Sequence, residues 1–95
     1  MTNTPKVHVV HNPQGRRFEI SKDGFLAVLE YQLTEGKITF THTGVPEALG
    51  GKGVGSSLAA AGLDYARAQS LTVLPLCPFI AGYIQKHPEY QNLVK

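Results

Sequence analysis

Gly50-Gly51-Lys52-Gly53-Val54-Gly55 is the stretch that decides the fold of this chain, because it joins a strand-like segment to the longest helical pattern. Glycine has no side chain to cover its amide group, and it adopts the positive φ angles that tight turns require. At the N-terminus of a helix, the free backbone N–H groups and the helix dipole both favour an anion. The stretch therefore predicts a loop that binds a phosphate-bearing ligand.

The segments on either side of this loop predict the fold. Before it, short runs of alternating apolar and polar residues are separated by turn compositions, and we expect strands at residues 6–11, 16–22, 25–33 and 38–43. After it, apolar side chains recur at three- and four-residue intervals from Val54 to Ala68, as in an amphipathic helix. A buried strand at 71–76, a helix at 79–86 and a short helix at 88–94 follow. The order β-β-β-β-α-β-α predicts an α+β fold, in which helices pack on an antiparallel or mixed sheet.

The length and composition restrict the classes of protein to which the chain can belong. With 95 residues, we expect one domain spanning 1–95, because two separate cores would each be too small. The net charge is only +2 and the basic residues are scattered, so we expect no nucleic-acid partner. No apolar stretch is long enough for a signal peptide or a membrane span. The single cysteine rules out an internal disulfide, and we expect a cytoplasmic protein.

Two well-known glycine loops do not fit the sequence. A P-loop requires a lysine after its last glycine, and Ser56 occupies that position. A dinucleotide-binding loop would open a βαβ unit in a larger doubly wound domain, whereas this loop follows a series of antiparallel strands. The alternative that the glycines only cap a helix or allow close packing stays open. The number of glycines, and their position before an amphipathic helix, favour anion binding.

Cys77 is the candidate nucleophile. The sequence Leu74-Pro75-Leu76-Cys77-Pro78-Phe79 places the thiol between a buried strand and a helix whose first residue is expected to be Pro78. A helix N-terminus stabilises a thiolate and lowers the pKa of the thiol. The alternative is a buried cysteine that acts only as a small apolar side chain. The other histidines, His8, His11 and His87, have no metal-ligand spacing with Cys77, so we expect no zinc site.

His42 is the candidate proton acceptor. The alternation along 38–43 places it on one face with Ile38 and Phe40, while the threonines occupy the other face. A histidine titrates near neutral pH and can take a proton from an attacking nucleophile. The structural alternative is a histidine at the edge of the core, hydrogen-bonded to a neighbour.

These features together resemble the small, single-domain branch of the GNAT acetyltransferase superfamily. The resemblance rests on His42-Thr43, Val45-Pro46, the glycine loop, Pro75-x-Cys77-Pro78-Phe79 and the terminal His87-Pro88-Glu89-Tyr90, and it extends from about Phe18 to Val94. It implies an acetyl-CoA-dependent N-acetyltransferase. The coenzyme A pyrophosphate would bind the loop amides, which the resemblance assigns to Gly51, Lys52, Gly53, Val54, Gly55 and Ser56.

The resemblance also implies that Cys77 and His42 are the catalytic pair. The acceptor would be an unknown amine, either a small molecule or the lysine or N-terminus of a protein. Two positions depart from the family pattern. Gly50 stands where the loop usually opens with Gln or Arg, and Gly44 stands where the small branch usually has a glutamate after His-Thr. Without that acid, proton transfer would fall to His42 or to water. A non-catalytic coenzyme A binder is the alternative function, and the oligomeric state stays open.

Overall fold

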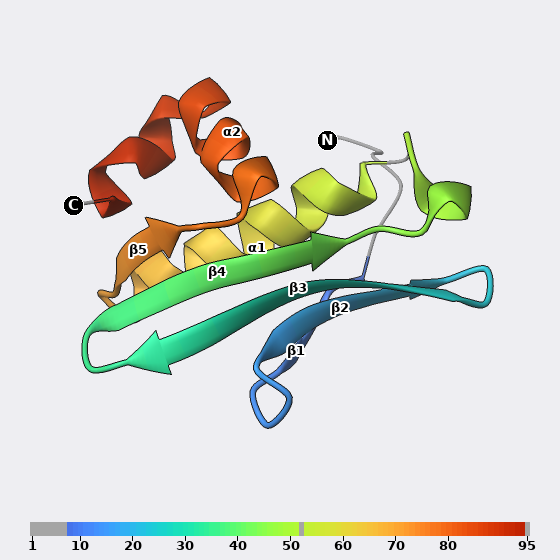
Figure 1. Ribbon diagram of the computed structural model, residues 1–95, viewed down its shortest axis with the longest axis horizontal. Coiled ribbons are helices and arrows are strands. Elements are labelled where there is room, and N and C mark those ends of the chain that lie inside the picture. The colour runs from blue at the N-terminus through green and yellow to red at the C-terminus, as the bar shows by residue number, and fades with distance from the viewer. Residues whose placement is uncertain (1–7, 52, 95) are drawn as a thin grey trace, which may run out of the picture.

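The computed structural model describes residues 8–51 and 53–94 (Figure 1). The elements in chain order are β1 (Val10–Asn12), β2 (Arg17–Lys22), β3 (Phe25–Thr34), β4 (Lys37–Gly44), the 3₁₀ helix η1 (Glu47–Leu49), α1 (Val54–Ala68), β5 (Thr72–Pro75), α2 (Pro78–Lys86) and the 3₁₀ helix η2 (Pro88–Leu93). The α+β class and the predicted order of strands and longer helices are confirmed. The first strand begins only at Val10, later than predicted.

The strands form one mixed sheet in the order β1-β2-β3-β4-β5. The first four make an antiparallel meander, and β5 pairs with β4 in parallel after the α1 crossover. The turn between β2 and β3 consists of Asp23 and Gly24, whose φ angles are 54° and 80°. Positive φ at both central residues is typical of the tight hairpin turn whose twist matches that of the strands.

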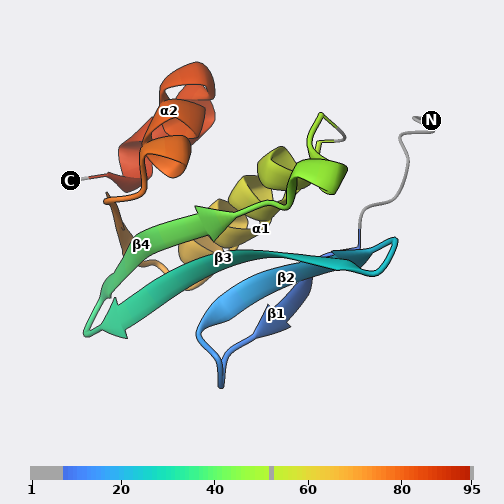
Figure 2. The ribbon, with the colours of Figure 1, turned by 45° about the vertical axis from the view of Figure 1, so that its right-hand side comes forward.

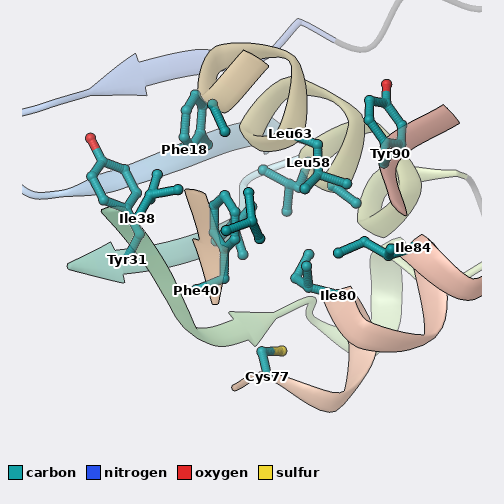
Figure 3. Packing of buried hydrophobic residues seen from close by; sticks show 14 of the residues in the cluster. Phe18, Tyr31, Ile38, Phe40, Leu58, Leu63, Cys77, Ile80, Ile84 and Tyr90 are labelled. Carbon is teal, nitrogen blue, oxygen red and sulfur yellow. The ribbon is translucent and has the colours of Figure 1, made fainter. Parts of the chain in front are cut away.

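Helix α1 lies against β2, β3 and β5 and covers one face of the sheet, and α2 lies beside it over β4 and β5 (Figures 1 and 2). Figure 3 shows the side chains between these layers, with Phe40 from the sheet facing Leu58 and Leu63 of α1. Gly62 brings α1 close to the sheet. A Cβ at this position would lie 2.8 Å from Leu29 Cδ2 and 2.9 Å from Phe40 Cε1. The helix can rest on the sheet at this distance because Gly62 has no side chain.

The C-terminal segment is tied to α1 by polar contacts. The Tyr90 hydroxyl donates a hydrogen bond of 2.8 Å to Asp64, and the Arg67 guanidinium donates one of 2.7 Å to the Glu89 carbonyl. Burial, followed by the hydrogen bond and charge of Asp64, raises the pKa of Tyr90 to about 12, so the hydroxyl remains a donor. These contacts give the tyrosine of the His-Pro-Glu-Tyr sequence a structural role.

In the described part of the chain, no helix is both long and apolar enough to cross a membrane.

The contact at Gly62 gives a prediction for stability. We expect Gly62→Ala to lower the free energy of unfolding by about 1–2 kcal/mol, because overpacking costs roughly 1–3 kcal/mol and the higher helix propensity of alanine returns less than about 1 kcal/mol. Gly82 of α2 is the matched control, since a Cβ there would meet nothing within 4 Å. Gly82→Ala should stabilise the protein in the same urea titration. Equal stabilisation by both substitutions would contradict the close contact.

His11 gives a second prediction. Its ring stacks on Phe18 at a centroid distance of 4.2 Å, meets Tyr65 edge-on at 4.5 Å, and hydrogen-bonds to the Tyr31 hydroxyl. Burial lowers the pKa of His11 below its usual value of 6.5. The unfolded chain therefore takes up this proton first, and stability falls as the pH drops through 6.5 toward the lower folded pKa.

The test compares melting temperatures of the wild type and His11→Phe between pH 7.5 and pH 5. Phenylalanine keeps a ring beside Phe18 but does not titrate. We expect the melting temperature to fall less with acid in the variant than in the wild type. If the two proteins lose stability in parallel, His11 is not the group responsible.

Candidate functional site

The site begins at an irregularity in β4. Tyr31 of β3 pairs with Phe40 and Glu30 pairs with His42, so one residue of β4, Thr41, is extra at this point. Such a bulge reverses the alternation of side chains beyond it. Thr43 lies opposite the buried Leu29, on the face that carries Phe40.

His42 lies on the opposite face. It pairs with Glu30, and its side chain is exposed. The expectation that His42 shares a face with Ile38 and Phe40 was therefore wrong, because strict alternation does not hold across a bulge. A Cβ at Gly44 would lie 3.2 Å from His42 Nε2, so the imidazole occupies the space beside this glycine.

The C-terminal part of β4, beyond Phe40, does not pair with β5. The parallel pairing ends at Phe40 and Pro75, and one further hydrogen bond of 3.0 Å runs from the Cys77 N–H to the Phe40 carbonyl. Beyond this hydrogen bond, β4 continues to Gly44, while the segment that follows β5 turns into α2. Figure 2 shows this last part of β4 leading into the turn before α1. An opening therefore lies between the end of β4 and the N-termini of the two helices.

Cys77 occupies the N-cap position of α2, and its sulfur lies 3.1 Å from the Thr43 hydroxyl oxygen. Figure 3 shows it at the margin of the core, close to Ile80. Burial raises the pKa of the Cys77 thiol, but the Thr43 hydroxyl and the backbone N–H groups of Ile80, Phe79 and Thr43 stabilise the thiolate. These donors outweigh burial, and the pKa is lowered. The sequence-based expectation of a helix-cap thiol is met by this geometry.

The glycine loop ends directly at α1. Gly51 and Gly53 have φ angles of 74° and 75°, which a residue with a side chain rarely adopts, and Gly53 is the N-cap. The first bond of the helix runs from the Ser57 N–H to the Gly53 carbonyl. The N–H groups of the preceding helical residues have no acceptor within the helix. Three donors, from Val54, Gly55 and Ser56, are thus gathered at the positive end of the helix dipole.

A cleft of about 490 Å³ connects this helix start to the end of β4. Its lining residues are Thr43, Val45, Leu49, Gly50, Gly51, Gly53, Val54, Gly55, Ser56 and Phe79. Of the residues predicted to bind coenzyme A, all except Lys52 line this cleft. Lys52 lies outside the described residues. The cleft reaches Thr43, which contacts the Cys77 sulfur, so the loop and the thiol belong to one site.

Phe79 shows that packing also requires one of the glycines. A Cβ on Gly55 would lie 2.8 Å from Phe79 Cζ, so the ring rests against the first turn of α1. The packing alternative for the loop therefore holds at Gly55. It does not explain Gly51 or Gly53, where a Cβ would meet nothing within 4 Å.

Two site residues were missed by the sequence analysis. Thr43, rather than His42, hydrogen-bonds to Cys77, and Phe79 forms one wall of the cleft. Only a bulge could bring Thr43 to this face, and the sequence carries no recognised signal for it. Phe79 stands in the quoted Pro75–Phe79 motif, but its contact with the loop required the fold. Among residues 8–51 and 53–94, no three His, Cys, Asp or Glu side chains gather as a metal site.

Comparisons with known proteins agree with this arrangement. Protein NATD1 from Mus musculus is 33% identical over 90 residues, which cover 92% of this chain and 82% of the mouse protein. Protein NATD1 from Homo sapiens is 32% identical, with coverages of 92% and 80%. The solution NMR structure of a GCN5-like protein from Staphylococcus aureus superimposes with a TM-score of 0.74 and 29% identity, over 96% of this chain and 90% of that one.

The sequence also matches the GCN5-related N-acetyl-transferase family over residues 17–93, which include Cys77 and all the residues that line the cleft. On the combined grounds of sequence, fold and site, the chain belongs to the GCN5-related N-acetyltransferase family.

Proposed function

We propose that this protein is an acetyl-CoA-dependent N-acetyltransferase that transfers an acetyl group to an amine. The observation that carries the proposal is the single cleft that joins the free N–H groups of α1 to the Thr43–Cys77 pair. Membership of the family supports acetyl-CoA as the donor. The acceptor amine is a small molecule or a lysine or N-terminus of a protein.

The diphosphate of coenzyme A binds the amides from Gly51 to Ser56. Neutral peptide donors at a helix N-terminus suit a diphosphate because they need no desolvation of a counter-charge. The pantetheine arm would then run along the cleft past Val45, whose partly exposed side chain gives it an apolar contact. This path leads the thioester to Thr43 and the Cys77 sulfur.

In the covalent route, the Cys77 thiolate attacks the thioester carbonyl carbon. The new C–S bond forms, the bond to the coenzyme A sulfur breaks, and that sulfur leaves as a thiolate that takes up a proton. An amine then attacks the acetyl-cysteine, loses a proton and releases Cys77. The lowered pKa of Cys77 favours this route, since the thiolate is the nucleophilic form.

In the direct route, the amine attacks acetyl-CoA itself and His42 accepts its proton. His42 is exposed on the outer face of β4, where a dissolved acceptor can reach it. Its role stays a prediction. The covalent route uses Cys77, whose hydrogen-bond partner Thr43 lines the cleft. We therefore favour the covalent route over the direct one.

A non-catalytic coenzyme A binder is the second candidate function. It is favoured by one observation: none of the residues that line the cleft carries a carboxylate that could serve as a general base. Such a protein would bind acetyl-CoA with the same loop and transfer nothing.

Coenzyme A binding is tested by thermal unfolding. A hundredfold excess of acetyl-CoA over its dissociation constant adds roughly 2.7 kcal/mol of stability. For a domain of this size, that should raise the melting temperature by roughly 10–20 °C, at about 4–8 °C per kcal/mol. Gly53→Val should abolish the rise, because the valine displaces the backbone from the positive φ that aims the loop amides.

Gly24→Val is the matched control for this variant. Gly24 has a φ of 80° in the β2–β3 hairpin, and a Cβ there also meets nothing within 4 Å. Both variants carry the same backbone strain, but only one changes the loop. A full acetyl-CoA shift in Gly53→Val would show that the loop does not hold the diphosphate.

The covalent route is tested by mass spectrometry after incubation with acetyl-CoA. We expect one acetyl group on Cys77, absent in Cys77→Ser, and a rate of labelling that rises with pH to a plateau. Thr43→Val removes the hydroxyl that stabilises the thiolate, so the midpoint of this pH profile should move upward. Thr43→Ser keeps a hydroxyl and should retain the wild-type midpoint. Absence of the adduct across the pH range, with acetyl-CoA bound, would exclude the covalent route and leave the direct route or the non-catalytic binder.

A further inference from the structure

One face of the sheet carries no helix in the part of the chain that the structure describes. Helices α1 and α2 both pack on the face of Phe40, and the strands present their other face to solvent (Figures 1 and 2). The end of β4 borders both sides, because Thr43 lines the cleft and His42 lies on the open face. With coenzyme A in the cleft, an acceptor can approach the thioester from the open face.

Glu30 lies beside His42 on this open face. It is the residue of β3 that pairs with His42 of β4 on one side and with Arg17 of β2 on the other. Residues that lie directly opposite each other on neighbouring strands have their Cβ atoms roughly 4.5–5.5 Å apart. A carboxylate therefore stands one strand spacing, about 4.8 Å, from the strand whose end borders the cleft.

The positive charge of Arg17 is engaged by a different carboxylate. The Arg17 Nε–H donates a hydrogen bond of 2.5 Å to Glu19, which accepts another of 3.0 Å from Asn12 Nδ2. The bonds from Asn12 and Arg17 lower the pKa of Glu19. Glu30 is half-buried, yet its side chain makes no hydrogen bond or ion pair with any described residue. One carboxylate beside His42 is thus left for a cation from outside the chain.

Leu76 adds an apolar surface near the same strand end. It directly precedes Cys77 and is 69% exposed. The hydrogen bond from the Cys77 N–H to the Phe40 carbonyl holds this segment against β4. The carbon chain of an acceptor can therefore contact Leu76 close to the thiol, while a charged group on the acceptor reaches toward β3.

We propose that Glu30 recognises the acceptor and that the acceptor is a small alkyl diamine. The inference rests on the proposed function, since it requires an acetyl group presented at the end of β4. One nitrogen of the diamine reacts, and the other stays protonated and pairs with Glu30. A chain of four carbons is long enough to span one strand spacing of about 4.8 Å between the two groups.

The transfer itself keeps its balance with such an acceptor. The reacting ammonium gives one proton to His42, and the neutral nitrogen attacks the thioester carbonyl carbon. The C–N bond forms, the C–S bond breaks, and the departing thiolate takes the second proton from that nitrogen. The second ammonium group takes no part in these bonds, so its pairing with Glu30 sets specificity alone.

The experiment compares amines of equal length that differ only at the far end. The second group is an ammonium in 1,4-diaminobutane, a methyl in 1-aminobutane and a carboxylate in 4-aminobutanoate. Acetylated product is measured by mass spectrometry, and kcat/KM is expressed per reactive nitrogen. We expect the diamine to exceed 1-aminobutane about threefold to tenfold, as one half-buried charge pair would give, and 4-aminobutanoate to fall below both.

Variants of Glu30 test the residue itself. Glu30→Gln keeps the size of the side chain but not its charge, and should bring the diamine down to the level of 1-aminobutane. Glu30→Lys should reverse the order, so that 4-aminobutanoate becomes the better acceptor. Glu35→Gln is the matched control, because it removes the same charge in the exposed β3–β4 turn and should keep the wild-type preference. The melting-temperature rise with acetyl-CoA checks that each variant is folded.

The outcomes separate the two proposals. If the wild type binds acetyl-CoA but acetylates no amine, the proposed transfer activity and this inference fall together. Equal kcat/KM for the three amines, or a preference that survives in Glu30→Gln, would overturn this inference alone. The same holds if a blocked pentapeptide with a single lysine is a better acceptor than the diamine, since a protein would then be the substrate.

Discussion

The bulge at Thr41 is the constraint on which the site depends. Without it, regular alternation would place His42 on the face of Phe40 and turn Thr43 outward. The extra residue reverses this order and sets the Thr43 hydroxyl 3.1 Å from the Cys77 sulfur. It also falls where β5 stops pairing with β4. One local irregularity therefore sets the Thr43 hydroxyl beside the Cys77 sulfur at the place where the pairing of β4 with β5 ends.

The glycines of this chain have different structural roles, as the atoms that an added Cβ would meet at each position show. Gly51 and Gly53 face open space and are required for their positive φ. Gly55 and Gly62 are required because Phe79 and Phe40 lie against α1 where a Cβ would be. The two packing glycines fix α1 on the sheet and against α2. Its free N–H groups are thereby held at one end of the cleft.

The sequence was enough for the order of elements, since alternation, turn residues and helical spacing are local properties. It also placed Cys77 at the start of a helix, because Pro78 is favoured at the first helical position. It failed at His42, because a bulge arises from pairing between strands distant in the sequence. The contact of Phe79 with Gly55 likewise joins elements that only the tertiary fold brings together. The structure places the described loop residues on the cleft, and their role in binding stays a prediction.

The N-termini of α1 and α2 both lie at this cleft. The start of α1 presents N–H groups beyond Gly53, and the start of α2 presents those of Phe79 and Ile80 to the Cys77 sulfur. Both ends of the cleft therefore stabilise negative charge, and no carboxylate among its lining residues opposes them. A thioester of coenzyme A carries a diphosphate at one end and develops a thiolate at the other when its acyl group is transferred. Negative charge would therefore lie at the two helix starts both in the bound donor and during transfer, and the backbone, rather than charged side chains, would hold it.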